Sequence, residues 1–242
     1  MEAQVGIANF NIKAHEVDFR KKLTLPFLFQ YLFRTSEKQT LLHGLDLGTL
    51  NRRNLSWVLS HVEIEMTEYP MYYEAVEINT WVEKIMSPFM IRNFEIKNKD
   101  NNTIGLVRTI WALFDLEERA VKDLKEFDLS GIYLPEKVNP MVRGKKIRLP
   151  EEVDYSYNYT VKTCDLDINK HLTTCKYVER ILDTFDIEMF EQHEISRIDI
   201  DFISECKFGD KITIGRLKVD NEYLCSIKKD NEIACKCRIM FK

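Results

Sequence analysis

The chain has 242 residues, of which 45% are hydrophobic and 31% charged, a composition typical of folded globular proteins and unlike that of disordered or fibrous ones. The formal net charge of −4 gives no overall attraction for nucleic acid or for an anionic membrane, so no nucleic-acid partner is expected. No apolar run approaches the roughly 20 residues needed to cross a bilayer, so no membrane span is expected.

The N-terminal residues and the cysteines indicate the compartment. The first residues, MEAQVGIANFNIKAHEV, lack the basic start and apolar stretch of a secretory signal. All six cysteines lie in the C-terminal part, and their spacing resembles neither a disulfide framework nor a set of metal ligands. We therefore expect free, reduced thiols, a cytoplasmic location, and no metal or other cofactor.

The first half of the chain predicts a strand, a buried helix and four further strands. Phe10 to Phe19 alternates apolar and polar residues, as a half-buried strand does. A helix follows from about Pro26 to Leu42, with Thr24 as its cap and Gly44 just beyond its end. Runs rich in Val, Ile, Trp, Thr and Phe then predict four strands: Leu55–Met66, Ala75–Ile85, Met90–Asn98 and Thr103–Leu116.

A Pro-rich and basic segment from Asp123 to Pro150 precedes a second set of elements. Tyr155–Val161 predicts a strand, and Thr173–Phe190 predicts a helix with one apolar face. Four more strands are expected: Glu194–Lys207, Lys211–Val219, Glu222–Lys228 and Glu232–Phe241. We assign residues 1–136 to a first repeat, 137–152 to a linker and 153–242 to a second repeat.

The order of elements is the same in both repeats, although few residues are identical. A strand, a buried helix and four antiparallel strands form the hot-dog arrangement, in which a long helix is wrapped by one antiparallel sheet. The sequence therefore predicts an α+β double hot dog.

Motifs in both halves resemble those of the acyl-acyl carrier protein thioesterases, plant and bacterial enzymes that end fatty acid synthesis. The fullest match is DLDINKHL, from Asp165 to Leu172, with the following Lys176-Tyr177-Val178; together they are similar to the family's D-x-N-x-H…K-Y motif. Shorter matches follow the family's order along nearly the whole chain: Tyr69-Pro70 before EINTWV (77–82), RTIWALFDL (108–116) and Ser204-Glu205-Cys206. The resemblance implies an enzyme that hydrolyses the thioester of fatty acyl-acyl carrier protein, releases free fatty acid and ends chain elongation.

The chain also departs from the family's pattern. Thr173-Thr174 replace the usual pair of Asn after the motif, and Arg180 stands where an aromatic residue is usual. We expect these departures to affect pocket polarity and preferred chain length rather than the reaction type. No transit segment is recognised, so the chain resembles a bacterial member.

The resemblance implies one partner, acyl carrier protein bearing a fatty acyl chain, and a homodimer is a candidate assembly. The carrier is acidic and this chain has a negative net charge, so association requires a local basic patch. The candidate patches are Arg20-Lys21-Lys22, Arg52-Arg53, Arg143-Lys145-Lys146-Arg148, and Lys170 with Lys176 and Arg180.

The loop before the second helix holds more polar side chains than a helix cap requires. His171 is suited to carry protons near neutral pH, and the Asn169 amide can hold an imidazole, a water or the substrate carbonyl. Asp167 can orient either of them, and the N-terminus of the following helix offers N–H groups to an oxyanion. The alternative interpretation is that Asp167 and Asn169 only form caps and turns. The resemblance favours catalysis.

Hydrolysis also needs a base or nucleophile, and the resemblance places it at Glu205 or Cys206. On a regular strand, Cys206 lies on the same inward face as Ile200, and Glu205 lies on the outward face. A bulge near Ser204 would exchange the two directions. Cys206 would form an acyl-enzyme with His171 as its base, whereas Glu205 would activate water. We favour Glu205, because the water route needs no second thioester.

Other proteins of this fold provide alternatives: thioesterases acting on coenzyme A esters, 3-hydroxyacyl dehydratases, and acyl-binding proteins without catalysis. The matched motifs disfavour a dehydratase, and the intact Asp167, Asn169 and His171 disfavour a protein that only binds. The entrance of the first helix, Asp18 to Lys22, has no counterpart of the motif, so we expect the first repeat to provide the acyl pocket. Its candidate lining residues are Phe27, Phe29, Tyr31 and Phe33, for which plain core packing is the alternative.

Overall fold

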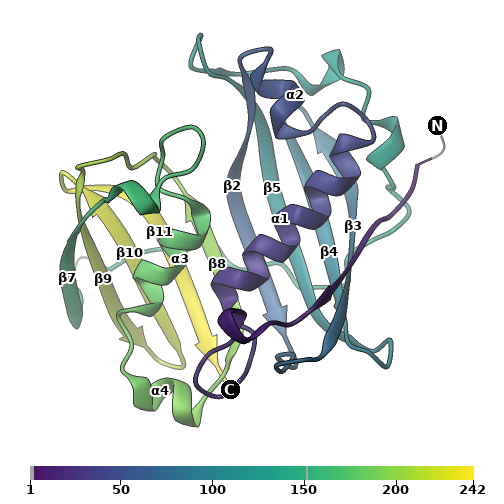
Figure 1. Ribbon diagram of the computed structural model, residues 1–242. Coiled ribbons are helices and arrows are strands. Elements are labelled where there is room, and N and C mark those ends of the chain that lie inside the picture. The colour runs from purple at the N-terminus through teal and green to yellow at the C-terminus, as the bar shows by residue number, and fades with distance from the viewer. Residues whose placement is uncertain (1–2, 151) are drawn as a thin grey trace. The chain divides into compact units, whose positions relative to one another are not determined.

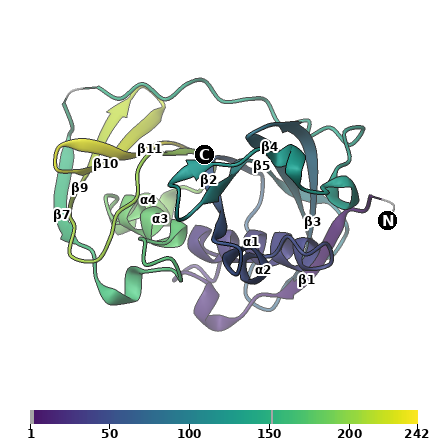
Figure 2. The same ribbon diagram turned by 90° about the horizontal axis from the view of Figure 1, so that it is seen from above.

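The computed structural model describes residues 3–150 and 152–242 (Figure 1). The chain divides into two compact units, one formed by residues up to Thr24 and by Gln30–Val142, the other by Leu25–Phe29 and Arg143–Lys242. Seen from above, each sheet carries its helices on one face (Figure 2). None of the helices in the described part of the chain is long and apolar enough to cross a membrane.

The first unit combines most of the long helix α1, from Gln30 onward, with an antiparallel sheet. Its elements in chain order are β1 (Gly6–Asn11), η1 (Ala14–Glu16), α1 (Leu25–Leu41), α2 (Leu47–Asn51), β2 (Leu55–Met66), β3 (Ala75–Met86), β4 (Phe89–Lys97), β5 (Thr103–Asp115), β6 (Ala120–Val121), η2 (Leu124–Glu126) and η3 (Ser130–Ile132). The strand order is β1-β3-β4-β5-β2, and β6 pairs with the end of β5. Figure 1 shows α1 crossing the face of this sheet.

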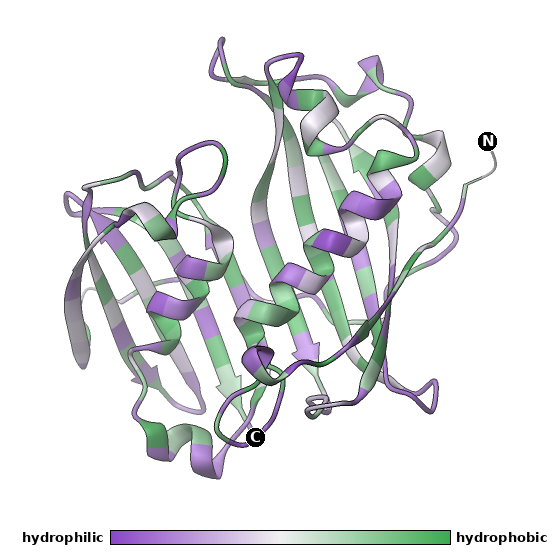
Figure 3. Cartoon of the chain, viewed as in Figure 1, coloured by the Kyte–Doolittle hydropathy of each residue, from purple (hydrophilic) through white to green (hydrophobic). Residues whose placement is uncertain are grey.

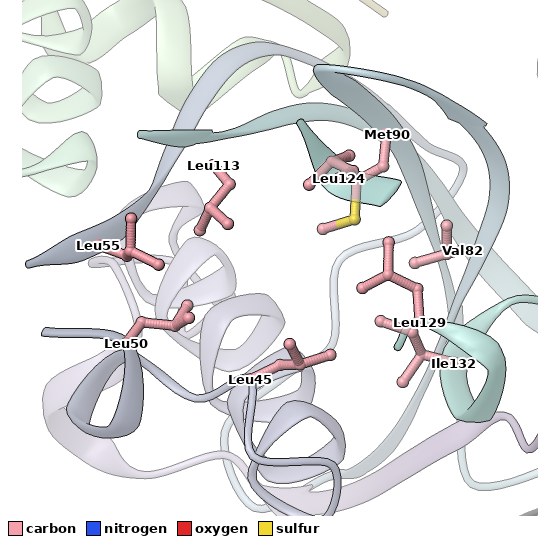
Figure 4. Packing of buried hydrophobic residues seen from close by; sticks show 9 residues of the cluster. All are labelled: Leu45, Leu50, Leu55, Val82, Met90, Leu113, Leu124, Leu129 and Ile132. Carbon is pink, nitrogen blue, oxygen red and sulfur yellow. The ribbon is translucent and has the colours of Figure 1, made fainter. Parts of the chain in front are cut away.

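The core of the first unit extends into the short elements that follow β5. One buried cluster joins the sheet to α2, η2 and η3 (Figure 4), and its members are Leu45, Leu50, Leu55, Val82, Met90, Leu113, Leu124, Leu129 and Ile132. Burying such side chains stabilises a fold by about 1.5–3 kcal/mol each. The first part of the Pro-rich segment that begins at Asp123 is therefore core rather than spacer.

The second unit repeats the arrangement of the first. Its elements are β7 (Tyr155–Thr160), η4 (Thr163–Asp165), α3 (Thr174–Leu182), α4 (Ile187–Gln192), β8 (Ile195–Phe202), β9 (Lys211–Val219), β10 (Glu222–Lys229) and β11 (Glu232–Phe241). The strand order is β7-β9-β10-β11-β8, which is the order of the first unit when the strands are matched in sequence. The predicted α+β double hot dog is confirmed.

The helix expected over Thr173–Phe190 is two helices, so that prediction was wrong in its second half. The Thr184 hydroxyl donates to the Ile181 carbonyl at 2.7 Å, and Arg216 donates to the Thr184 carbonyl at 2.5 Å. This turn points the Phe185 ring into an aromatic cluster with Phe190, Tyr223 and Phe241. The apolar periodicity continues through the break because Phe190 of α4 joins Phe185 in this cluster; both helices carry hydrophobic and hydrophilic residues (Figure 3).

The strand expected over Phe10–Phe19 was wrong over most of that range: β1 runs from Gly6 to Asn11, so only Phe10 and Asn11 lie in both. A buried carboxylate turns the chain there: Glu16 accepts hydrogen bonds from the Lys13 backbone N–H at 2.6 Å and from the Tyr31 hydroxyl at 2.5 Å. Alternation of apolar and polar residues continues past the strand, which is why the sequence did not reveal its end.

Each sheet carries a buried arginine–carboxylate pair. In the first unit the Arg108 guanidinium lies 2.9 Å from Glu63, across the β5–β2 register. In the second unit Arg238 pairs with Asp199 across β11–β8, and Arg197 also reaches Asp199, at 2.8 Å. These positions alternate with the apolar residues that face the helix, so the pairs lie on the opposite face of each sheet.

The backbone of the linker is tied to these arginines. Arg108 donates to the Met141 carbonyl at 2.8 Å, and Arg238 donates to the Lys145 carbonyl at 2.9 Å. Gly144 packs so closely that a Cβ there would lie 2.5 Å from a carboxylate oxygen of Asp199. The linker is therefore fixed by its main chain, and its basic side chains at 143, 145, 146 and 148 are exposed.

Candidate active site

The polar loop between η4 and α3 is shaped by Asp167. One oxygen of its carboxylate accepts the backbone N–H groups of Asn169 at 2.8 Å and of His171 at 3.0 Å. Its own N–H donates to the His171 carbonyl at 2.8 Å, and Lys170 between them takes the left-handed conformation, with φ 63°. Asp167 thus orients His171 through the backbone.

Asp165 anchors the other end of the loop. It is buried, and its carboxylate accepts the Lys162 N–H at 2.7 Å and the Tyr159 hydroxyl at 2.9 Å. Its carbonyl accepts the Thr173 N–H at 2.9 Å, and Thr173 caps α3 by accepting from Lys176. The loop is therefore held at both ends independently of any substrate.

The His171 imidazole meets the Glu205 carboxylate. Nε2 of His171 lies 3.2 Å from Oε2 of Glu205, and the two side chains are 17% and 31% exposed. Both are partly shielded but open to a ligand. A histidine and a carboxylate at hydrogen-bond distance can accept and return protons near neutral pH.

The chain reaches this position because β8 ends at Phe202, before the Glu205-Cys206 pair. The N–H groups of Ile203 and Ser204 both point to the Ala234 carbonyl, at 2.9 and 3.2 Å, so the regular ladder stops there. Beyond the strand, strict alternation no longer applies. Glu205 can therefore face His171 while Cys206 turns inward and is fully buried.

Cys206 has surroundings that disfavour a nucleophile. Burial raises the pKa of its thiol, against a smaller lowering by the hydrogen bond with the Tyr177 hydroxyl. A nucleophilic cysteine needs a depressed thiol pKa or an adjacent base. The imidazole of His171 pairs instead with Glu205.

Asn169 lies in the same turn and is half-buried. The structure thus gathers the five predicted residues in one place: Asp167, Asn169, His171, Glu205 and Cys206. Within the described residues, no group of three or more His, Cys, Asp or Glu side chains is arranged to hold a metal ion.

The loop before α1 has the same backbone as the loop before α3. One oxygen of Asp18 accepts the N–H groups of Arg20 at 2.9 Å and Lys22 at 3.1 Å. The Asp18 N–H donates to the Lys22 carbonyl at 2.9 Å, and Lys21 has φ 65°. Asp18 therefore occupies the place of Asp167, although the residues around it do not match the family motif.

The segment that the loop before α1 contacts corresponds to the segment that the loop before α3 contacts. Leu23 donates to the Pro70 carbonyl at 2.9 Å, as Leu172 donates to the Cys206 carbonyl at 2.7 Å. Tyr69-Pro70 therefore stands where the second repeat has Glu205-Cys206. The first repeat keeps the scaffold and lacks the histidine and the carboxylate.

The aromatic residues proposed to line an acyl pocket differ in their packing. Tyr31 stacks on Phe10 at 4.1 Å between centroids and donates its hydroxyl to Glu16, so it belongs to the core. Phe29 is fully buried, and Phe33 packs edge-on against Trp111. These contacts favour the core-packing alternative for Tyr31 in particular.

The candidate basic patches differ in whether their side chains are paired with carboxylates. Lys176 and Arg180 pair with Glu179, Arg180 also pairs with Asp183, and Arg20 pairs with Asp18. Lys170 is exposed, and so is Lys207, whose backbone lies beside that of His171. The sequence did not indicate Lys207, because it approaches the loop only in the folded chain.

The sequence also missed two residues behind Glu205. The Tyr177 hydroxyl is hydrogen-bonded to the chain on either side of Glu205, and Lys229 donates to the Glu205 carbonyl at 2.9 Å. Tyr177 was interpreted as a member of the apolar helix face, and its match to the Lys176-Tyr177 part of the family motif was the available signal.

Comparisons with known proteins match both halves of the chain to the same family. The profile of the acyl-ACP thioesterase N-terminal domain matches residues 4–130, and that of the C-terminal domain matches residues 149–242. A palmitoyl-acyl carrier protein thioesterase from Gossypium hirsutum is 25% identical over 213 residues, which are 82% of this chain and 51% of that protein. The chain spans about half the length of the curated relatives it matches.

Solved structures extend the likeness to three dimensions. An acyl-ACP thioesterase from Bacteroides thetaiotaomicron is 30% identical with a TM-score of 0.89, covering 98% of both chains. A 12:0-ACP thioesterase from Umbellularia californica, at 17% identity, shares the fold with a TM-score of 0.87 over 100% of this chain and 98% of that one.

Proposed function

The chain belongs to the acyl-ACP thioesterase family, and from this premise we propose that it hydrolyses the thioester of fatty acyl-acyl carrier protein and releases the free fatty acid. The observation that carries the proposal is the contact of 3.2 Å between His171 and Glu205, in a loop that Asp167 holds in shape. It joins a proton carrier to a carboxylate where the family motif lies.

Glu205 is the base in this proposal. Its carboxylate takes a proton from a water molecule, whose oxygen attacks the thioester carbonyl carbon and forms a tetrahedral oxyanion. The Asn169 amide donates to the carbonyl oxygen as its negative charge develops. Glu205 hands the proton taken from water to Nε2 of His171 across their 3.2 Å contact. Collapse of the intermediate breaks the carbon–sulfur bond, and His171 delivers this proton to the departing thiolate.

The water route is tested against the acyl-enzyme route by two substitutions. Glu205→Gln should lower kcat by about 10²–10⁴-fold, the usual contribution of a general base. Cys206→Ala should leave substantial turnover, because the buried thiol has no step to perform. Complete loss of activity in a folded Cys206→Ala variant would instead establish the acyl-enzyme route.

A panel of acyl-carrier substrates of different chain lengths and saturation, with free fatty acid measured, tests the function itself. Release of fatty acid from carrier thioesters supports the proposal and identifies the preferred chain. Turnover of coenzyme A thioesters without turnover of any carrier thioester would favour the coenzyme A thioesterase. Binding of the acyl chain without hydrolysis of either would favour the non-catalytic reading.

The carrier partner is proposed to contact Lys170 and Lys207. Both are exposed and flank His171, the end point of the carrier's prosthetic arm. Charge reversal at both positions should lower kcat/KM about tenfold or more for acyl-carrier substrate, because complementary charge governs encounter. Turnover of an acyl-pantetheine thioester, which is uncharged, should change far less.

The exposed linker lysines Lys145 and Lys146 provide the matched control for this test. Their reversal changes the net charge equally at a different site. If the linker variant loses more carrier-linked turnover than the Lys170/Lys207 variant, the linker is the docking surface instead.

A further inference from the structure

We propose that Tyr177 is a positioning residue whose hydroxyl fixes the chain on both sides of Glu205 and thereby directs the carboxylate to His171. This role rests on the proposed function, since it assigns the task of activating water to Glu205. Tyr177 itself touches no reacting atom in the proposal.

The hydroxyl of Tyr177 bridges two peptide groups. It donates to the Ser204 carbonyl at 3.2 Å and accepts the Cys206 N–H at 3.1 Å. These two groups flank Glu205 directly. A single oxygen therefore sets the direction in which the Glu205 side chain leaves the backbone.

Two further contacts complete the hold on this segment. Lys229 donates to the Glu205 carbonyl at 2.9 Å and pairs with Asp210 at 3.3 Å. The Cys206 carbonyl accepts the Leu172 N–H at 2.7 Å. The backbone of residues 204–206 is thus fixed by contacts from α3, β10 and the histidine loop.

Tyr177 is itself rigid. Its side chain is buried, and its ring packs edge-on against Phe202 with centroids 5.5 Å apart. It lies four residues beyond Thr173, the cap of α3, which follows His171 by two residues. One short stretch of chain therefore carries the imidazole and also holds the carboxylate that the imidazole meets.

The first repeat provides independent support. Where the second repeat has Cys206, the first has Pro70, which has no N–H to donate. Where α3 has Tyr177, four residues beyond its cap Thr173, α1 has Leu28, four residues beyond its cap Thr24. The bridging hydroxyl and the N–H it binds are thus both absent from the repeat that lacks the carboxylate.

Tyr177→Phe tests the proposal, with Tyr157→Phe as the matched control. The Tyr157 hydroxyl also donates to a backbone carbonyl in the same unit, that of Arg180, at 2.7 Å. Both variants should lower the urea midpoint by similar amounts. Only Tyr177→Phe should lower kcat, by about tenfold to a hundredfold with KM within twofold, because small misplacements of a catalytic group are costly.

A double-mutant cycle with Glu205→Gln shows whether the hydroxyl acts through the carboxylate. Single-turnover rates, measured with enzyme in excess, should show that Tyr177→Phe has little further effect once Glu205 is replaced. An equal effect in both backgrounds, or a kcat within twofold of wild type in Tyr177→Phe alone, would overturn the proposal.

A crystal structure of the Tyr177→Phe variant gives a readout that needs no turnover. We expect the segment 204–206 to shift and the His171–Glu205 contact to lengthen, and an unchanged contact would count against the proposal. Wild-type protein that releases no fatty acid from any thioester would refute the proposed function, whereas an active wild type with an unaffected Tyr177→Phe variant refutes only the positioning role.

Discussion

The loops before α1 and α3 follow the same path with different side chains. In each, an aspartate accepts two backbone N–H groups, a lysine has positive φ, and a leucine donates to the segment that follows a strand. The first loop offers Arg20 and Lys22 where the second has Asn169 and His171. The facing segment offers Tyr69 where the second repeat has Glu205.

This difference distinguishes the residues that shape the loop from those proposed to react. Asp18 makes the same backbone hydrogen bonds as Asp167, although Lys22 and Tyr69 stand where the second repeat has His171 and Glu205, so those bonds are structural. The three changed positions supply the proposed amide donor, proton carrier and base.

His171→Ala should lower kcat/KM for acyl-carrier substrate by about 10²–10⁴-fold, since it removes the proton carrier. Its counterpart, Lys22→Ala, should stay within twofold of wild type. Free fatty acid release measures both, and urea unfolding confirms that both variants fold. A large loss in Lys22→Ala would show that the first loop takes part in the reaction.

Loss of the arginine from each buried ion pair should lower the free energy of unfolding by different amounts in the two units. Arg108→Met should lower the free energy of unfolding by about 3–5 kcal/mol, because the other partner of the buried Glu63, His61 at 3.3 Å, is charged only when protonated. Arg238→Met should cost less, about 2 kcal/mol, because Arg197 still neutralises Asp199. Urea unfolding measures both, and an equal loss would show that Arg197 does not compensate.

Asp18→Ala and Asp167→Ala should each destabilise the protein by about 1 kcal/mol, since two N–H groups lose their acceptor. Only Asp167→Ala should lower kcat, by about tenfold or more, because His171 loses its placement. Asp167→Asn keeps an accepting oxygen and should retain most of the activity. Loss of activity in Asp167→Asn would instead assign a role to the charge of Asp167.

The smallest effect should come from alkylation of the thiols. Burial raises the pKa of the Cys206 thiol, so little thiolate forms near neutral pH, whereas Cys164 is exposed. Iodoacetamide at pH 7.5 should label Cys164, leave Cys206 unmodified and change kcat by less than twofold. Mass spectrometry of the labelled peptides checks the first two outcomes, and rapid inactivation with Cys206 labelled would contradict them.

Long apolar segments were predictable from the sequence, and breaks in them were not. The bounds of β2, β9 and β11 agree with those expected, because alternation and β-branched residues extend to the strand ends. The end of β1 and the break between α3 and α4 depend on tertiary contacts, the Glu16–Tyr31 bond and the Arg216–Thr184 bond. Such contacts join residues distant in sequence, and local patterns do not record them.

The site was predictable where a motif is contiguous. The cluster from Asp167 to His171 lies in one turn, whereas the approach of Glu205 depends on where β8 ends. Alternation alone would have turned Glu205 away from His171. The motif includes Tyr177, but its contacts beside Glu205, like that of Lys229, depend on the folding of three segments around one peptide.

The anchored linker determines where the halves of such proteins can be exchanged. Arg108 binds the backbone at Met141 and Arg238 binds it at Lys145, so only the few residues between them are free of either anchor. A chimera that takes its first repeat from another family member should be joined there, with Gly144 retained because a side chain would meet Asp199. Junctions placed earlier or later would separate an arginine from the carbonyl it binds.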